Sequence, residues 1–173
     1  ANSINIGRLL PQCTYYAHAA MQHLRATGRK PSFVVPAGNL GNGFACIVAR
    51  HAGLPIGNVV LATNVNRLIA DYLDGSEWLP RASIATLASA MDVGYASNME
   101  RLRSLLGNAD RIRQSLRVFS ISDDEIRRQI RKDYQRFGFA VCPHTATATC
   151  AYDQLSEAER TREDWILVAT AHA

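Results

Sequence analysis

Two kinds of segment follow one another along the chain. Short apolar runs at 32–36, 59–63 and 165–170 stop at glycine, proline or polar residues, which is typical of buried strands. The segments between them carry apolar residues every three or four positions, which predicts helices. The predicted helices cover residues 5–26, 41–52, 65–73, 98–106, 109–117, 122–137, 145–152 and 156–162. Strands that alternate with helices predict an α/β fold with a mainly parallel sheet flanked by helices.

Local signals support two of the helix boundaries. Gly28 lies just past the end of the first predicted helix, as expected of a C-terminal stop. Ser122 and Glu125 have the spacing of a capping box at the start of helix 122–137. Residues 80–94 show no sustained period, so no element is predicted there.

The stretch from Ser32 to Asn42 is the most informative for chemistry. Its β-branched run stops at Pro36 and turns through Gly38 and Gly41 into a helical pattern. The first amides of a helix have no backbone acceptor, and the helix dipole favours negative charge there. Glycine lets a backbone approach a phosphate closely and take up φ > 0. The stretch therefore predicts a cradle for the phosphate of a nucleotide or cofactor, with an ordinary strand-to-helix turn as the alternative.

Composition narrows the class of protein. At 173 residues, 47% hydrophobic and 20% charged, the chain has the size and balance of one globular domain. No apolar run approaches the length that crosses a bilayer, so no membrane partner is expected. The four cysteines lack C-x-x-C or zinc-ligand spacing, which favours reduced thiols in a cytoplasmic protein and no metal site.

The net charge of +4 does not by itself indicate nucleic-acid binding. The arginines between Arg101 and Arg136 are interleaved with acidic residues, which is the pattern of a solvated helix face. No nucleic-acid recognition motif accompanies them, so no nucleic-acid partner is expected.

Motifs along the whole chain resemble those of threonine synthases. Asn2-Ser3-Ile4-Asn5-Ile6-Gly7-Arg8 resembles the N-S-x-N-x-x-R motif of that family. Residues 36–42, Pro-Ala-Gly-Asn-Leu-Gly-Asn, resemble its P-[ST]-G-N-x-G-[ND] cofactor loop. The other matches follow in the family's order: Gly53-Leu54-Pro55-Ile56, Ala62-Thr63-Asn64-Val65-Asn66, Met91-Asp92-Val93, Ser97-Asn98-Met99-Glu100-Arg101, Pro143-His144-Thr145-Ala146 and Ala169-Thr170-Ala171-His172. The resemblance covers this entire sequence but well under half of a family member.

The resemblance implies a fold and a reaction. Threonine synthases are similar in fold to the tryptophan synthase β subunit, the second fold type of pyridoxal phosphate enzymes, so residues 1–173 are expected to form part of such a catalytic domain. The family makes L-threonine and phosphate from O-phospho-L-homoserine and water in threonine biosynthesis. Its cofactor, pyridoxal 5'-phosphate, serves as the electron sink. The substrate partner implied is therefore O-phospho-L-homoserine.

The resemblance also gives roles to individual residues. The cofactor phosphate would be held by the backbone of Gly38, Asn39, Leu40, Gly41 and Asn42. Thr170, expected at the end of the last strand, would hydrogen-bond the pyridine nitrogen. The substrate phosphate would be bound by Asn2, Ser3 and Arg8, since a guanidinium, an amide and a hydroxyl are suitable donors. From the residues alone, Asn2 and Ser3 also suit a helix cap, and Arg8 a surface arginine.

Further polar residues lie in the family motifs. His144 invites a general-base role, but a histidine held by its neighbours is the preferred interpretation. Asp92 and Asn98 are expected to make structural hydrogen bonds. Asn64 is expected to fix the turn after a strand, together with Asn66.

The chain departs from the family at three places. Ala37 stands where the family has serine or threonine, and Ala173 where proline is common. The chain has only two lysines, Lys30 and Lys132, and neither lies in the motif of the family's Schiff-base lysine. No catalytic residue is therefore assigned, and the chain alone is expected to be inactive.

Three interpretations stay open at this point. The leading one is a part of a threonine synthase, whose remaining polypeptide is the missing partner, because the chain starts inside a motif and stops after an apolar strand. A non-catalytic module that binds phosphate or pyridoxal phosphate is the alternative. A related dehydratase acting on serine or threonine is the third, and the N-S-x-N-x-x-R and M-D-V segments argue against it.

Overall fold

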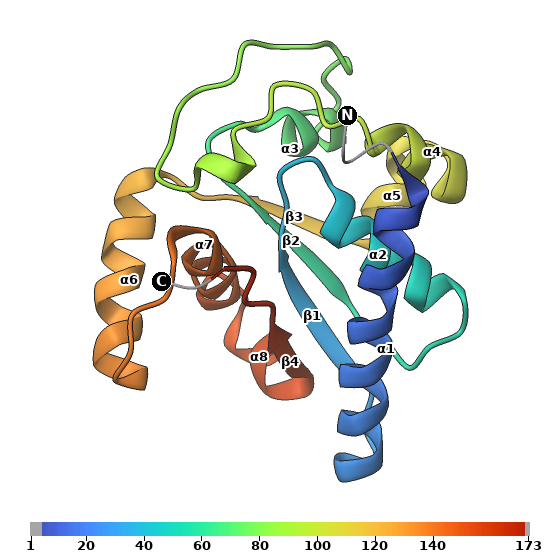
Figure 1. Ribbon diagram of the computed structural model, residues 1–173, viewed down its shortest axis with the longest axis vertical. Helices are drawn as coiled ribbons and strands as arrows, with labels where there is room; N and C mark the ends of the chain where they lie inside the picture. The colour runs from blue at the N-terminus through green and yellow to red at the C-terminus, as the bar shows by residue number, and fades with distance from the viewer. Residues whose placement is uncertain (1–4, 172–173) are drawn as a thin grey trace.

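A four-stranded parallel sheet forms the centre of the computed structural model, which describes residues 5–171 (Figure 1). The strands lie in the order β3-β2-β1-β4. Their bounds are β1 Pro31–Pro36, β2 Val59–Thr63, β3 Arg117–Ser120 and β4 Asp164–Leu167. All three pairings are parallel, which confirms the predicted α/β architecture.

Helices connect the strands and cover both faces of the sheet. They are α1 Ile6–Thr27, α2 Gly41–His51, α3 Leu68–Leu73, α4 Met99–Leu106, α5 Ala109–Ser115, α6 Asp123–Phe137, α7 Pro143–Asp153 and α8 Glu157–Arg162, with a short 3₁₀ helix, η1, at Ser89–Met91. Gly28 ends α1 in the left-handed conformation at φ 72°, as expected of a C-terminal stop. No helix within residues 5–171 is both long and apolar enough to cross a membrane.

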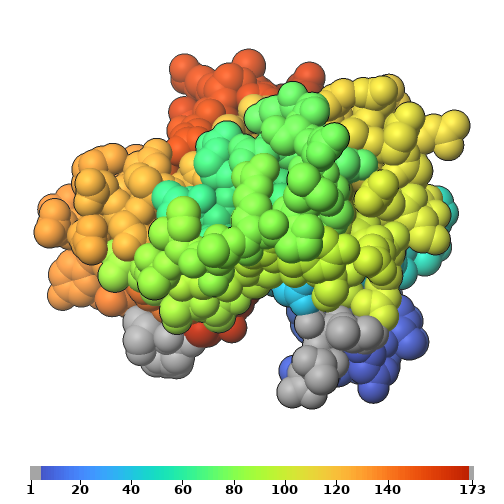
Figure 2. Space-filling model, turned by 90° about the horizontal axis from the view of Figure 1, so that it is seen from above, coloured from blue at the N-terminus to red at the C-terminus, as the bar shows by residue number. Residues whose placement is uncertain are grey.

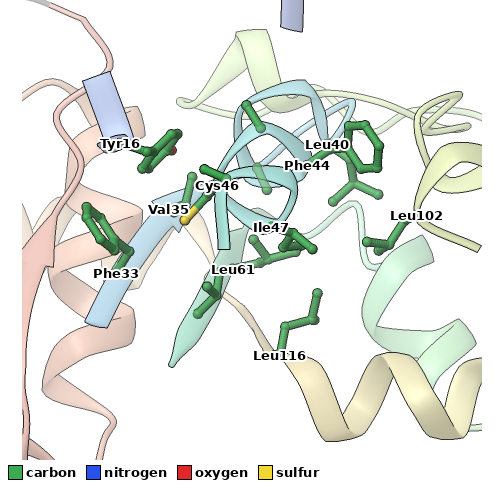
Figure 3. Packing of buried hydrophobic residues seen from close by; sticks show 14 of the residues in the cluster. Tyr16, Phe33, Val35, Leu40, Phe44, Cys46, Ile47, Leu61, Leu102 and Leu116 are labelled. Atoms are coloured by element: carbon green, nitrogen blue, oxygen red, sulfur yellow. The ribbon is translucent and has the colours of Figure 1, made fainter. Parts of the chain in front are cut away.

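Side chains from the two faces of the sheet enter separate cores. Phe33 and Val35 of β1 pack with α1, α2, α4 and α5, whereas Val34 packs with α6 and α7. This alternation follows from the period of two along a strand. Figure 3 shows Leu40 and Phe44, at the start of α2, on the side of the first core toward Leu102 of α4.

Several helix ends differ from the prediction by one to three residues, as at α3, which begins at Leu68 rather than at residue 65. The differences at β3, β4 and α7 have a physical reason. β3 was missed, and residue 117, expected in a helix, begins this strand, which pairs Val118 with Leu61. The predicted buried strand 165–170 was wrong in extent and burial, because β4 ends at Leu167 and is half-buried at the sheet edge. α7 begins at Pro143 rather than at residue 145, since proline fits the first turn of a helix.

A long connection crosses the edge of the sheet where the strands end. Residues 74–98, between α3 and α4, contain only the short helix η1. Figure 2, viewed from above, shows this green segment across the face of the molecule. We call residues 74–98 the crossing segment. It matters for the site because it contacts the loop that follows β1.

Candidate functional site

The loop between β1 and α2 leaves the first amides of α2 open. No side chain caps this helix. Within residues 5–171 the N–H groups of Gly41, Asn42 and Gly43 have no hydrogen-bond acceptor, and the first backbone bond runs from Phe44 N to Leu40 O at 2.7 Å. Together with the helix dipole, these open amides could hold an anion, which is the chemistry that the sequence predicts for this loop. We call residues 37–42 the anion loop.

The positive φ of the anion loop falls on a leucine and not on a glycine. Leu40 has φ 64°, the only such non-glycine residue in the described part of the chain, whereas neither Gly38 nor Gly41 has a positive φ. The glycines of this loop therefore do not serve to supply a positive φ. The Leu40 side chain is almost fully buried in the core, which offsets the cost of the conformation.

Gly38 is required by packing against the crossing segment. A Cβ at this position would lie 2.8 Å from Met91 Cα and 3.1 Å from Ala90 O. Both neighbours are backbone atoms and cannot move away cheaply. The glycine therefore serves the close approach of η1, and this contact fixes one side of the anion loop.

The side chain of Asn42 is oriented by two tyrosines of α1. Its Oδ1 accepts hydrogen bonds from Tyr15 Oη at 2.9 Å and from Tyr16 Oη at 2.7 Å. Burial raises the pKa of both phenols, so both remain protonated donors at neutral pH. Because Oδ1 faces the tyrosines, Nδ2 is left as a donor on the other side of the amide.

Asn42 and Thr170 line the same cavity. This cavity of about 570 Å³ is lined by Gln12, Tyr15, Asn42, Val168, Ala169 and Thr170. Thr170 does not end a strand as predicted, but is exposed three residues beyond β4, and its N–H donates to Thr145 Oγ1 at 3.4 Å. The fold thus brings together the two ends of the predicted cofactor site, although the strand ends earlier.

The predicted substrate-phosphate residues are only partly described. Asn2 and Ser3 lie outside the described residues. Arg8 is exposed in the first turn of α1, next to Leu9, whose Cδ2 lies 3.2 Å from the Cβ position of Gly41. Asn5 caps α1 through a bond from Gly7 N to its Oδ1 at 2.8 Å.

The remaining polar motif residues are held by hydrogen bonds, in line with the preferred interpretations. His144 Nε2 accepts from Ala90 N at 3.1 Å, while its Nδ1 is buried without a partner in the described structure. Asp92 accepts from Asn64 Nδ2 and from Thr86 Oγ1, each at 2.7 Å. Asn66 N donates to Asn64 Oδ1 at 3.0 Å. These bonds fix the crossing segment onto the end of β2.

Neither lysine lies at the anion loop. Lys30 is exposed directly before β1, whereas the anion loop follows β1. Lys132, on α6, forms an ion pair with Asp153 Oδ2 at 2.7 Å. All four cysteines are free. Burial raises the pKa of Cys150 to about 11, so this thiol is no thiolate nucleophile at neutral pH.

Four residues of the site were missed by sequence reasoning. Gln12, Tyr15 and Tyr16 belong to α1, and of these only Tyr16 carries a sequence signal, since it lies on the apolar, buried face of that helix. Ser97 bonds the side chain of Asn39, with its N–H donating to Asn39 Oδ1 at 2.6 Å. The signal for Ser97 was its place in a family motif.

Comparison with known proteins places the chain in a family. The profile of the family described as "Pyridoxal-phosphate dependent enzyme" matches residues 11–171. The chain therefore belongs to the pyridoxal-phosphate dependent enzymes.

Within that family, the chain is similar to threonine synthases, which confirms the resemblance. It is 36% identical over 174 residues to the threonine synthase of Escherichia coli K12, covering 99% of this chain and 39% of that protein. The threonine synthase of Haemophilus influenzae is also 36% identical, over 172 residues, with 99% of this chain and 40% of that protein covered. The chain thus spans about two fifths of the length of these relatives.

Solved structures support the same similarity. A pyridoxal phosphate-bound threonine synthase from Brucella melitensis superposes with a TM-score of 0.88 at 30% identity, covering 99% of this chain and 42% of that one. Maize serine racemase, at 14% identity and a TM-score of 0.65 over 92% of this chain and 49% of that one, shares the fold.

The residues present fit pyridoxal phosphate, the cofactor of the family. A phosphate is a dianion or monoanion near neutral pH, and the open amides of Gly41 to Gly43 are donors aligned with the helix dipole. The cavity that Asn42 lines is large enough for an aromatic ring, and its polar lining includes Gln12, Asn42 and Thr170.

Proposed function

We propose that this chain carries the cofactor-phosphate loop and part of the substrate-phosphate site of a threonine synthase. The whole enzyme would convert O-phospho-L-homoserine and water to L-threonine and phosphate. The observation that supports this most directly is the uncapped N-terminus of α2, whose second residue, Asn42, lines a cavity together with Thr170. The similarity to threonine synthases over 99% of the chain supports the choice of reaction.

The residues of this chain would bind and orient. The amides of Gly41, Asn42 and Gly43 would hold the cofactor phosphate, and Asn42 Nδ2 is a further donor at the same cavity. The Thr170 hydroxyl would hydrogen-bond the pyridine nitrogen and, being neutral, would leave that nitrogen less protonated than a carboxylate would. The bound cofactor would supply the electron sink for carbanion chemistry.

Arg8 would bind the phosphate of the substrate, together with Asn2 and Ser3. A guanidinium on the first turn of α1 offers two parallel donors to an oxyanion. The packing of its neighbour Leu9 on Gly41 supports a position of the Arg8 guanidinium near the anion loop. The two phosphates would therefore be bound by the first turns of two adjacent helices.

The loop would bind its phosphate through backbone groups. Ala37 is buried, and its N–H is not free for a ligand because it donates to Ala62 O at 2.8 Å. Its methyl side chain has no hydroxyl to offer either. We expect a lower affinity than with serine or threonine and no change of ligand. Since neither lysine lies at the loop, the covalent attachment of the cofactor would come from the remaining polypeptide, and this chain alone would be inactive.

A titration of the 173-residue chain with pyridoxal phosphate tests the proposed binding. We expect saturable binding of pyridoxal phosphate that inorganic phosphate inhibits competitively. No adduct should form after borohydride treatment, because no lysine is at the site. An adduct on Lys30 or Lys132 with one-to-one stoichiometry would contradict the assignment of the site. Absence of binding would contradict the proposal that these residues suffice to hold the cofactor phosphate.

A chimera separates the enzyme from the alternative, a non-catalytic binding module. The matching two fifths of the E. coli threonine synthase are replaced by this chain, and threonine formation is measured. Turnover, with Arg8→Ala raising KM for the phosphorylated substrate, supports the proposed reaction. A chimera that binds pyridoxal phosphate without turnover supports the binding module instead.

A further inference from the structure

Asn98 occupies a helix cap without capping the helix. It is the N-cap residue of α4, where asparagine is favoured because its side chain bonds the first amides. Here the side chain makes no such bond. Its Nδ2 instead donates to the backbone carbonyl of Asn39 in the anion loop at 2.8 Å, and the residue has no exposed surface.

Arg101 sets the orientation of the Asn98 amide. Its Nη1 donates to Asn98 Oδ1. A guanidinium has donors only, so the oxygen of the amide must face it, and the nitrogen is directed to Asn39 O. The Arg101–Asn98–Asn39 chain of hydrogen bonds therefore has one consistent direction.

The carbonyl that Asn98 holds belongs to the peptide group between Asn39 and Leu40. In a trans peptide the carbonyl and the following N–H point in opposite directions, so holding the carbonyl fixes the whole plane. That plane defines φ of Leu40, the residue with φ 64°. The side chain of Asn39 is held as well, since Ser97 N donates to its Oδ1 at 2.6 Å.

We infer that Asn98 is a positioning residue for the anion loop: it holds the Asn39 carbonyl, and thereby keeps Leu40 in the conformation that turns the open amides of α2 toward a phosphate. The identity of that phosphate, the one on pyridoxal phosphate, rests on the proposed function. Asn98 itself touches no ligand in this scheme. Its effect passes entirely through the backbone of residues 39 and 40.

The test compares the two asparagines that occupy N-cap positions of neighbouring helices. Asn98→Asp removes the donor to Asn39 O but keeps the acceptor for Arg101, and Asn98→Ala removes the donor without adding charge. Asn108→Asp is the matched control, because Asn108 makes an ordinary cap bond through its oxygen to Arg111 N at 3.1 Å. All variants are made in the 173-residue chain.

Two readouts are measured for each variant. The first is hydrogen exchange of the Phe44 amide without ligand, since this amide bonds Leu40 O at 2.7 Å and reports on the loop. The second is the dissociation constant of pyridoxal phosphate, with pyridoxal, which lacks the phosphate, as the comparison ligand. We expect both Asn98 variants to speed exchange and weaken pyridoxal phosphate binding roughly tenfold, since a lost buried hydrogen bond has about this effect. Binding of pyridoxal should not change.

The outcomes separate this inference from the proposed function. Asn98 variants that match Asn108→Asp in both readouts would overturn the inference. So would an equal loss of affinity for pyridoxal and pyridoxal phosphate, which a general loss of structure would produce. If the unmodified chain binds no pyridoxal phosphate, the proposed function fails, and the exchange of Phe44 alone decides the role of Asn98.

Discussion

The first N–H groups of α2 and of α6 lack acceptors within their helices, and the two helices differ in whether a side chain supplies one. At α6, Ser122 Oγ accepts from Glu125 N, and Glu125 Oε2 accepts from Ser122 N at 2.8 Å, so the capping box is complete. At α2, no side chain caps the helix, and Leu40 precedes it with a positive φ. The comparison shows that side-chain caps stabilise the start of α6, whereas α2 lacks this stabilisation. The open helix is the one that borders the cavity lined by Thr170.

The largest effect is expected from replacing Leu40. Truncating this buried side chain should cost about 2–5 kcal/mol of unfolding free energy. Glycine usually destabilises by roughly 0.5–1 kcal/mol relative to alanine, but at a positive φ this order should reverse. We therefore expect Leu40→Gly to be at least as stable as Leu40→Ala, as measured by urea unfolding.

Leu61 provides the control for this reversal. It is also fully buried, but it lies in β2, where φ is negative in ordinary strand geometry. Leu61→Gly should be less stable than Leu61→Ala. The same order at both positions would show that the conformation of Leu40 is not strained.

Gly38→Ala should have the next largest effect. The new Cβ would meet Met91 Cα at 2.8 Å, and such overpacking costs about 1–3 kcal/mol of unfolding free energy. Because η1 and the anion loop would separate, the affinity for pyridoxal phosphate should fall as well. Both quantities are measured on the same protein, by urea unfolding and by titration.

Gly28→Ala is the control for Gly38→Ala. Gly28 has φ 72° at the end of α1, with no atoms near its Cβ position. This variant should lose stability through its backbone conformation and keep its affinity for pyridoxal phosphate. A Gly38→Ala protein that also keeps its affinity would contradict the role of η1 in supporting the loop.

The sequence predicted the elements with strong periodicity and the position of the anion loop. The buried runs at β1 and β2 and the helix 122–137 appear where apolar spacing and the capping box place them. The helix terminus after Pro36 could be predicted because proline, glycine and the helical pattern that follows are all signals in the local sequence.

The parts that failed depend on tertiary contacts. β3 has only four residues and begins with an exposed arginine, so nothing local marks it until β2 pairs with it. The positive φ of Leu40 is stabilised by burial and by Asn98, which lies 59 residues beyond Asn39 in the chain. The hydrogen bond from Asn98 to the anion loop could not be predicted, because an asparagine at a helix start more often caps its own helix.

Ser122→Ala tests the capped helix, α6. Loss of an N-cap serine costs about 1 kcal/mol, so the unfolding free energy should fall by that amount. The affinity for pyridoxal phosphate should stay the same, because α6 does not border the cavity. Changed affinity would show that the two helix termini are coupled, contrary to this comparison.

The smallest effect concerns the ion pair that ties the crossing segment to α3. Arg81, in the crossing segment, bonds Asp71 of α3 and, with Arg67, holds the pKa of this carboxyl below its ordinary value of 3.8. A lowered pKa means that Asp71 contributes stability above pH 3.8, which is lost as the pH falls through its value in the folded state. Since Arg81 is largely exposed, the pair should contribute at most about 1 kcal/mol.

A double-mutant cycle of Asp71→Asn and Arg81→Gln measures this contribution by thermal unfolding. The coupling between the two changes should be present at pH 7 and should shrink as the pH falls below 3.8. A coupling that is independent of pH would mean that the two side chains interact by packing and not by charge. The crossing segment would then be tied to α3 by packing, beside its hydrogen bonds to Asn64 and to Asn39 of the anion loop.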